Sequence, residues 1–181
     1  MQDAEPPTDS ALLARAEAVG ADLLDLTPPA DHATIDRPLI AALAEAGLLG
    51  RLYPEGGVSA RDLCLIRQGL ARTNPHAETA FALQGLGSYP IHQSGRPEVA
   101  EKWIGRVVTG EAVPAFALTE PGAGSDAANL ALRAERDGDG WRLTGEKAWI
   151  SNAPGADVYT LFARTTPEAG SPFSAASFTS R

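Results

Sequence analysis

Hydrophobic residues recur every three or four positions through roughly the first 110 residues, the spacing typical of amphipathic helices. The pattern predicts helices over residues 12–24 and 38–49, a third opening at Ser59, a fourth from Pro75 to about Gly85 or Gly87, and a fifth beginning near Pro97. Asp36 is the expected N-cap of the second helix, and Ser59 followed by Asp62 resembles a capping box. The helices are expected to bury a core that includes Leu12, Leu23, Leu43, Leu48, Leu65, Leu70, Phe81 and Trp103.

After residue 110 the pattern changes to short runs typical of strands, over residues 112–118, 130–136, part of 141–149, and 158–163. Asp137-Gly138-Asp139-Gly140 predicts a hairpin between the second and third runs. The expected fold class is α+β, with an N-terminal all-helical domain over residues 1–110 followed by the beginning of an antiparallel β domain over residues 111–168.

Residues 169–181 show no clear pattern, and residues 171–177 are expected to form no structured element. Two or three strands are too few for a stable independent sheet, and open strand edges favour pairing with other chains. We therefore expect the chain to self-associate, or to keep its helices ordered while about the last fifty residues stay mobile.

Composition and charge narrow the class of protein. Hydrophobic residues make up 44% of the chain, which is typical of a globular protein. The net charge of −8 and the absence of a Lys or Arg run argue against a nucleic-acid partner. The acidic N-terminus does not resemble a targeting peptide, and no apolar run approaches the roughly 20 residues that span a bilayer. The expected location is cytoplasmic.

The metal-ligating residue types give no site. Cys64 is the single cysteine, so it can form neither an intrachain disulfide nor a Cys-rich zinc site, and a buried hydrophobic role is expected for it. His32, His76 and His92 lack metal-ligand spacing, and His92 is interpreted as a surface or helix-end residue. No metal is predicted.

The first motif with chemical content runs from Phe116 to Asp126, where a predicted strand leads into a loop containing two glycines and a serine. Such a loop exposes backbone N–H groups and hydroxyls, which suit phosphate and a polar heterocycle edge. Gly122-x-Gly124-x-x-Ala127 also imitates a dinucleotide fingerprint, but Pro121 precedes it and a hairpin follows in place of a βαβ unit. An ordinary glycine-rich turn is the alternative.

The second motif runs from Gly145 to Ala153. Trp149 and Ser151 are two positions apart, so on a strand they would share a face. An indole beside a hydroxyl suits a flat heteroaromatic ring, because one packs and the other forms a hydrogen bond. The alternative is that Trp149 belongs to the hydrophobic core.

Together these residues resemble the acyl-CoA dehydrogenase family. The sequence ALTEPGAGSD at positions 117–126 is similar to one signature of the family, and Gly145-Glu146-Lys147 with Trp149-Ile150-Ser151-Asn152 is similar to a second. Residues 86–91, followed by Gly95 and Trp103, resemble the helical region that precedes them. The resemblance covers roughly residues 10–168.

The resemblance implies an FAD site that consists of Phe116, Leu118, Thr119, Gly124, Ser125, Trp149, Ile150 and Ser151. In it, the Thr119 hydroxyl reaches the pyrimidine edge of the flavin, Trp149 packs against the ring, and the Ser151 hydroxyl lies near N5. Gly124 and Ser125 hold the pyrophosphate, and Ser125 also contacts the acyl-CoA substrate. The carboxylates of Glu120 and Asp126 shape the loop.

The reaction that the resemblance implies is α,β-desaturation of an acyl-CoA thioester, with hydride transfer to flavin N5. In this family the general base is a glutamate of a C-terminal helical domain, and an electron-transfer flavoprotein or a similar protein accepts the electrons. Full-length relatives are homo-oligomeric. The sequence therefore predicts a fragment of an FAD-dependent oxidoreductase, inactive alone. A non-catalytic module that pairs its open edge with a partner, and a nicotinamide-binding domain, are the alternatives.

Overall fold

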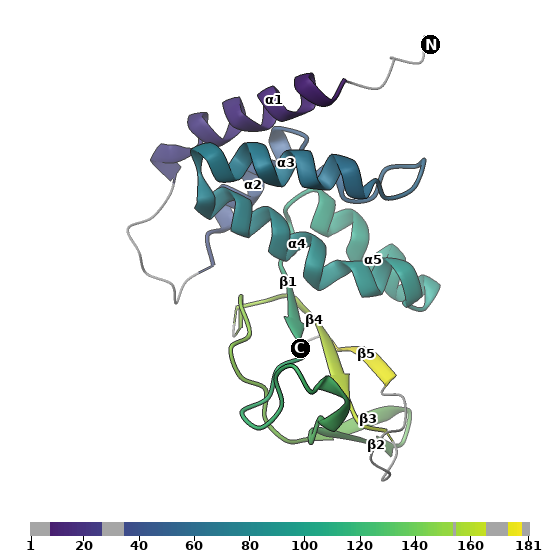
Figure 1. Cartoon of the computed structure of the whole chain (residues 1–181). Coiled ribbons are helices and arrows are strands. Elements are labelled where there is room, and N and C mark those ends of the chain that lie inside the picture. Colours follow the sequence, from purple (N-terminus) through teal and green to yellow (C-terminus); the bar gives the residue numbers. More distant parts are fainter. Residues whose placement is uncertain (1–7, 27–34, 154, 166–173, 179–181) are drawn as a thin grey trace. The chain divides into compact units, whose positions relative to one another are not determined.

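The computed structural model describes residues 8–26, 35–153, 155–165 and 174–178 (Figure 1). Its helices are α1 (Asp9–Asp22), α2 (Arg37–Glu45), α3 (Ala60–Thr73), α4 (Pro75–Ser94) and α5 (Pro97–Val108), with 3-10 helices η1 (Leu24–Leu26), η2 (Leu49–Arg51) and η3 (Ala127–Asn129). Its strands are β1 (Pro114–Ala117), β2 (Arg133–Asp137), β3 (Gly140–Thr144), β4 (Val158–Ala163) and β5 (Ser174–Phe178).

The chain forms two compact units. The first unit comprises residues 1–85 and 105–111, and the second unit comprises residues 86–104 and 112–181. Helices α4 and α5 are therefore each divided between the units, with residues 75–85 and 105–108 in the first unit and residues 86–94 and 97–104 in the second. The division into domains at residues 110 and 168 stays a prediction.

Side-chain caps fix the start of two helices in the first unit, as the sequence predicts. The Asp36 carboxylate accepts a hydrogen bond from the Leu39 N–H at 3.0 Å at the start of α2. The Ser59 Oγ accepts one from the Asp62 N–H at 3.2 Å at the start of α3. Helix α2 ends four residues earlier than expected, at Glu45, and Gly47 follows with φ 74°, which is the left-handed conformation typical of a helix C-terminus.

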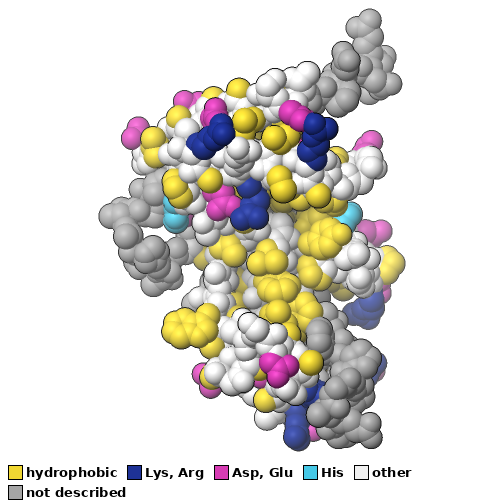
Figure 2. Space-filling view, in the orientation of Figure 1, with side chains coloured by type: hydrophobic (Ala, Val, Ile, Leu, Met, Phe, Trp, Pro, Cys, Tyr) yellow, Lys and Arg dark blue, Asp and Glu magenta, His cyan; other side chains and the backbone are white. Residues whose placement is uncertain are grey.

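Helices α1 and α3 lie side by side in the first unit (Figure 1). Glycine allows this close approach, because a Cβ added at Gly69 would lie 2.6 Å from the Ala16 Cβ and 2.7 Å from the Leu13 carbonyl oxygen. Ion pairs link the exposed faces of the two helices, including one between Arg72 and Glu17 at 2.5 Å. Basic and acidic side chains accordingly lie next to one another over α1 and α3 in Figure 2.

We expect Gly69→Ala to destabilise the first unit by about 1–2 kcal/mol, because the added methyl group forces the backbones of α1 and α3 apart. Gly105→Ala is the matched control, since it is also helical and has nothing within 4 Å of an added Cβ. It should stabilise the unit by up to about 1 kcal/mol through helix propensity. Urea unfolding monitored by circular dichroism measures both effects, and shifts of the same sign would contradict the close packing of α1 against α3.

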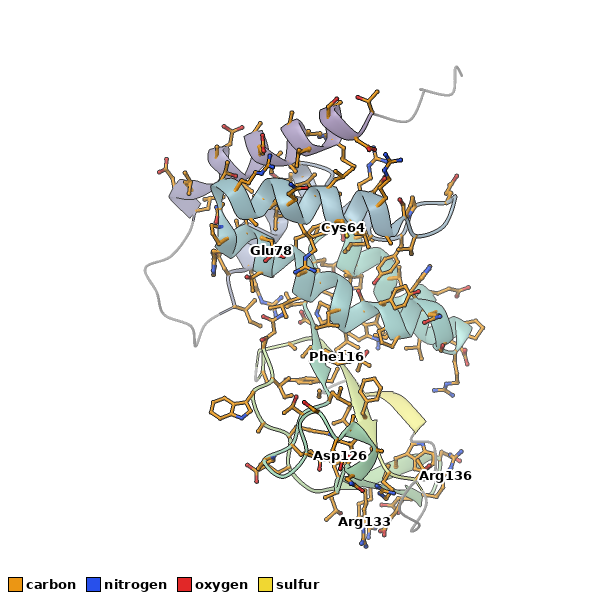
Figure 3. All side chains as sticks on the ribbon, in the orientation of Figure 1. Cys64, Glu78, Phe116, Asp126, Arg133 and Arg136 are labelled. Atoms are coloured by element: carbon orange, nitrogen blue, oxygen red, sulfur yellow. The ribbon has the colours of Figure 1, made fainter. Side chains whose placement is uncertain are left out.

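Most of the predicted core residues are buried, namely Leu12, Leu43, Leu48, Leu70, Phe81 and Trp103. Leu23 and Leu65 are instead only half-buried. The prediction for Cys64 is wrong, because its side chain is exposed on α3 (Figure 3). Cys64 is two positions from the buried Ile66, which places it about 200° away around the helix, on the outward face.

The predicted end of the fourth helix is also wrong, because α4 continues through both glycines and Pro90 to Ser94. Gly85 and Gly87 serve packing rather than termination. A Cβ at Gly85 would lie 3.0 Å from a Leu52 methyl group, and one at Gly87 would lie 2.8 Å from the Pro114 Cβ. The Thr160 hydroxyl donates to the Gly87 carbonyl oxygen at 2.7 Å, in the interior of the second unit.

The second unit contains a sheet with the strand order β1-β4-β5 and a separate hairpin of β2 and β3 (Figure 1). The β2–β3 and β4–β5 pairs are antiparallel, but β1 pairs with β4 in parallel, so the sheet is mixed where antiparallel pairing was expected. Residues 174–178 form β5, so the prediction of no structured element over residues 171–177 is wrong there. These residues pair with β4, and the local sequence pattern gives no sign of this distant pairing.

The hairpin predicted at residues 137–140 is confirmed, with Asp137 opposite Gly140. Two backbone hydrogen bonds of 2.8 and 2.9 Å join Leu132 and Ala134 to Arg164, immediately after β4. A small hydrophobic cluster of Leu132, Ala134 and Ala163 lies at this junction. The α+β fold class is confirmed. Among the described residues, no helix is long and apolar enough to cross a membrane. Self-association stays a prediction.

Candidate functional site

The first motif leaves the end of β1 and folds back through a short turn. Glu120 and Ala123 exchange two backbone hydrogen bonds of 3.1 and 3.2 Å, which close the turn around Pro121 and Gly122. The following Gly124 and Ser125 are exposed, and the Asp126 carboxylate accepts a hydrogen bond from the Asn129 side chain across η3. Figure 3 shows Phe116 on β1 and Asp126 in the loop region that follows.

The carboxylate of Glu120 is buried beneath this loop, with 5% of the residue exposed. Its Oε2 accepts a hydrogen bond from the Ala131 N–H at 2.6 Å. Its Oε1 accepts from the Leu132 N–H at 3.0 Å and from the Lys147 Nζ at 2.9 Å. Burial alone raises the pKa of Glu120, but the Lys147 hydrogen bond and the two backbone N–H groups outweigh it and hold the pKa below its usual value. The structure thus gives Glu120 the loop-shaping role that the resemblance implies.

Lys147 joins the two motifs. Its Nζ donates to the Leu118 carbonyl oxygen at 2.8 Å as well as to Glu120. The Lys147 and Glu120 side chains are only 7% and 4% exposed, so this is a buried ion pair. The next residue, Ala148, donates its N–H to the Thr119 carbonyl oxygen at 3.0 Å. The second motif is therefore fastened to the chain at the end of β1.

The strand expected over part of residues 141–149 is β3, which ends at Thr144, so the second motif is not a strand. Trp149 has φ 59° and Asn152 has φ 69°, and both values lie in the left-handed region that interrupts an extended chain. The prediction that Trp149 and Ser151 share a strand face is therefore wrong. The alternative of a core tryptophan is also wrong, because Trp149 is 91% exposed.

The eight residues predicted to bind the cofactor share one property, which is that none is fully buried. Four are half-buried and four are exposed: Phe116, Leu118, Thr119 and Ile150, and then Gly124, Ser125, Trp149 and Ser151. Their neighbours Ala115, Ala117, Glu120 and Ala123 are buried. We call these eight residues the accessible strip. Phe116 makes an edge-to-face contact with Phe162 of β4, with ring centroids 5.0 Å apart.

Lys147 and Asn152 lie within the second motif, but no role was predicted for either of them. The Asn152 Nδ2 donates to the Pro114 carbonyl oxygen at 3.1 Å, at the first residue of β1. The sequence places Glu146 directly before Lys147, so the local pattern did not indicate Glu120 as the partner of this lysine. The contact of Asn152 is non-local and had no signal in the pattern.

The nicotinamide-binding alternative lacks its structural context. A Rossmann fingerprint requires a helix directly after the glycines, whereas Gly124 is followed by the three-residue η3 and then by the antiparallel β2–β3 hairpin. Over the described part of the chain, no group of three or more His, Cys, Asp and Glu residues could hold a metal ion. His76 lies 3.4 Å from the Asp36 carboxylate, His92 is exposed in the last turn of α4, and His32 falls outside the described residues.

Two sequence families match the chain along most of its length. The acyl-CoA dehydrogenase N-terminal domain matches residues 15–111, and the acyl-CoA dehydrogenase middle domain matches residues 115–178. The chain belongs to the acyl-CoA dehydrogenase family. The resemblance drawn from the two motifs is thereby confirmed. The middle-domain match continues beyond residue 168 and includes β5.

Individual acyl-CoA dehydrogenases show the same relationship. Benzylmalonyl-CoA dehydrogenase of Aromatoleum aromaticum is 35% identical over 137 residues, which are 73% of this chain and 36% of that protein. The structure of an acyl-CoA dehydrogenase from Bacillus anthracis complexed with FAD has a TM-score of 0.81 and 28% identity, and the match covers 97% of this chain and 31% of that one. A glutaryl-CoA dehydrogenase from Mycobacterium smegmatis in complex with FADH2 has a TM-score of 0.80 and 25% identity, with 97% and 46% covered. The chain thus spans less than half of each protein.

Proposed function

We propose that this chain forms the FAD-binding and substrate-facing part of an acyl-CoA dehydrogenase that desaturates an acyl-CoA thioester between its α and β carbons. One observation carries the proposal. The bonds from Lys147 and Ala148 to the end of β1 place the two motifs next to each other and leave the eight candidate residues accessible. Membership of the family supports the reaction class, and the accessible strip supports the location of the site.

The chemistry of the strip fits a flavin. Trp149 holds a large apolar ring almost entirely in solvent, on a backbone conformation that costs on the order of 1 kcal/mol or more. A flat aromatic ligand that covers the indole would bury this surface, and the Thr119 and Ser151 hydroxyls could form hydrogen bonds with the edge of such a ligand. Bound FAD would supply the acceptor for the hydride that leaves the substrate.

The other candidate residues would contact the flavin ring, the pyrophosphate and the substrate. Phe116, Leu118 and Ile150 would line the ring, because they are apolar and half-buried, so part of each side chain stays accessible. Gly124 and Ser125 would hold the pyrophosphate through backbone N–H groups and a hydroxyl, which an exposed loop presents. Ser125 would also contact the acyl-CoA.

Glu120 is unsuited to remove the α proton of the substrate. Its two oxygens already accept hydrogen bonds from Lys147 and from two backbone N–H groups, and its pKa is lowered. A general base must be accessible to the substrate and needs a pKa closer to the working pH, whereas Glu120 is buried. We infer that the base comes from the C-terminal helical domain that the family resemblance implies, and that the 181-residue polypeptide is inactive alone. An electron-transfer flavoprotein or similar protein would accept the electrons, and homo-oligomers are the expected assembly.

Trp149→Ala is expected to weaken FAD binding by about 10- to 100-fold, because stacking on an aromatic side chain contributes roughly 1–3 kcal/mol per ring. The variant should unfold at the same urea concentration as the wild type, since Trp149 is 91% exposed. Titration of the apoprotein with FAD, followed by the flavin absorbance band, measures the affinity.

Trp149→Phe is the matched control, because it keeps an aromatic ring at the same position, and it should lose less affinity than the alanine variant. A parallel titration with NAD tests the cofactor itself. Tighter binding of NAD than of FAD by the wild type would refute the proposed function.

A further inference from the structure

The segment 147–152 runs alongside β1 in the opposite direction. At one end, the Ala148 N–H bonds to the Thr119 carbonyl oxygen, just after β1 ends at Ala117. At the other end, the Asn152 side chain bonds to the carbonyl oxygen of Pro114, where β1 begins. Residues 149–151 therefore lie between two points that are fixed to one strand.

The first fixed point includes a buried ion pair. Lys147 Nζ makes two hydrogen bonds, to the Leu118 carbonyl oxygen at 2.8 Å and to Glu120 at 2.9 Å, and both charged side chains are buried. Glu120 in turn holds the N–H groups of Ala131 and Leu132. One lysine thereby links the second motif to the first motif and to the residues that lead into β2.

The second fixed point combines a conformation with a hydrogen bond. Asn152 adopts φ 69°, which asparagine tolerates better than most residues, and its side-chain amide donates at 3.1 Å. Three positions earlier Trp149 adopts φ 59°, which a bulky residue adopts only when its surroundings impose it. The two fixed points are the contacts in the described structure that flank this strained residue on both sides.

We propose that Lys147 and Asn152 are positioning residues that clamp Trp149, Ile150 and Ser151 along β1 in the conformation that binds the cofactor. The inference rests on the proposed function, because it assigns the clamp to FAD binding. Neither residue is among those proposed to contact the cofactor. Lys147 sets the start of the segment and Asn152 sets its end, so that the exposed indole and the Ser151 hydroxyl are presented in a fixed arrangement before FAD arrives.

Two Asn152 variants separate the hydrogen bond from the backbone conformation. Asn152→Gly keeps the left-handed conformation and removes the donor, so FAD affinity should fall roughly 3- to 10-fold. Asn152→Ala removes the donor and also strains the backbone, so the loss should be greater, at about 10- to 100-fold. Ser59→Ala is the control, because it removes the α3 N-cap in the first unit and lowers stability without touching the clamp.

A readout on the apoprotein makes the clamp testable without FAD. The chain has three tryptophans, so 5-fluorotryptophan labelling gives three fluorine NMR signals, and Trp149→Phe identifies the signal of Trp149. In both Asn152 variants this signal should change in position and linewidth, because the backbone that carries the indole loses one of its two fixed points, while the other two signals stay in place. In Ser59→Ala, neither the Trp149 signal nor FAD affinity should change.

The two readouts distinguish failure of the clamp from failure of the proposed function. An unchanged Trp149 signal in both Asn152 variants would overturn the inference, as would a moved signal with FAD affinity within twofold of the wild type. If Ser59→Ala changed the Trp149 signal and the FAD affinity as much as the Asn152 variants do, the effects would reflect general stability, and the inference would also be overturned. If the wild type binds no FAD while the Trp149 signal still depends on Asn152, the proposed function fails, the assignment of the clamp to FAD binding fails with it, and the clamp stands as a property of the apoprotein.

Discussion

Lys147→Met is expected to destabilise the second unit by about 3–5 kcal/mol at pH 7, the usual cost of leaving a buried charge without its partner. Glu120 would remain buried and ionised, and the Leu118 carbonyl oxygen would lose its donor. Methionine preserves most of the length and volume of the lysine side chain, so the loss reports the ion pair rather than a cavity. Hydrogen exchange of the backbone amides of β1 and β4, measured at increasing urea concentration, reports the unfolding free energy of this unit.

The effect should shrink in acid. In the wild type the pKa of Glu120 is lowered, so its contribution to stability is complete above the ordinary pKa of a glutamate in the unfolded chain and is lost as the pH falls through the lower folded pKa. Removing Lys147 takes away the largest influence that lowers this pKa, so Glu120 protonates at a higher pH in the variant and the unpaired charge disappears earlier. The difference in unfolding free energy between the two proteins should therefore narrow between pH 7 and pH 4.

Two further variants complete this test. Arg142→Met breaks an ion pair with Asp137 that is exposed on the β2–β3 hairpin, and it should cost less than about 1 kcal/mol. The double variant Glu120→Gln with Lys147→Met leaves no buried charge and should recover part of the stability lost by Lys147→Met. A cost for Lys147→Met as small as that of Arg142→Met would show that the ion pair does not hold the motifs together.

The sequence predicted best those features that depend on neighbouring residues. The caps at Asp36 and Ser59 and the hairpin at residues 137–140 form within four positions of the chain, so their signals are visible in the local pattern. The helical core followed from the spacing of leucines. The outward face of Cys64 was missed because composition alone, without the helical phase set by Ile66, favours burial of cysteine.

The features that were missed depend on residues far away in the sequence. Gly87 looked like a helix end, but it is glycine because Pro114 lies against it, 27 positions along the chain. Residues 174–178 form a strand because β4 offers them an edge, and the parallel β1–β4 pair follows from a connection of forty residues that no local pattern specifies. Such pairings are set by tertiary contacts rather than by intrinsic propensity.

At the site, the motifs identified the residues but not their conformation. The family resemblance selected eight accessible residues. In the structure, Lys147 and Ala148 of the second motif bind the carbonyl oxygens of Leu118 and Thr119 in the first motif. The left-handed conformation of Trp149 could not be predicted, because it opposes the preference of a bulky residue and the contacts on either side of it join residues far apart in the sequence. Local rules thus fail at the residue with the clearest proposed function.

The 181-residue polypeptide loaded with FAD is expected to reduce an electron-accepting dye with acyl-CoA at a rate at least about 10² to 10⁴ lower than a complete acyl-CoA dehydrogenase. The reason lies in Glu120, the one carboxylate that is buried beside the strip in the described structure. It is buried, its oxygens accept hydrogen bonds from Lys147, Ala131 and Leu132, and its pKa is lowered, so it is poorly placed for removing the α proton. Steady-state dye reduction with a series of acyl-CoA chain lengths measures the rate.

The absorbance band of bound FAD must be present in the same sample, so that a low rate reflects the state of Glu120 and not a missing cofactor. Glu120→Gln provides the discriminating variant, because it keeps the shape of the side chain and removes its basicity. If the wild-type polypeptide turns over at a rate near that of a complete enzyme, and Glu120→Gln abolishes this turnover while FAD stays bound, then Glu120 must leave its three hydrogen bonds during the reaction. In that case the buried pair with Lys147 would belong to the catalytic machinery, and the loop-shaping role that the hydrogen bonds of Glu120 indicate would be wrong.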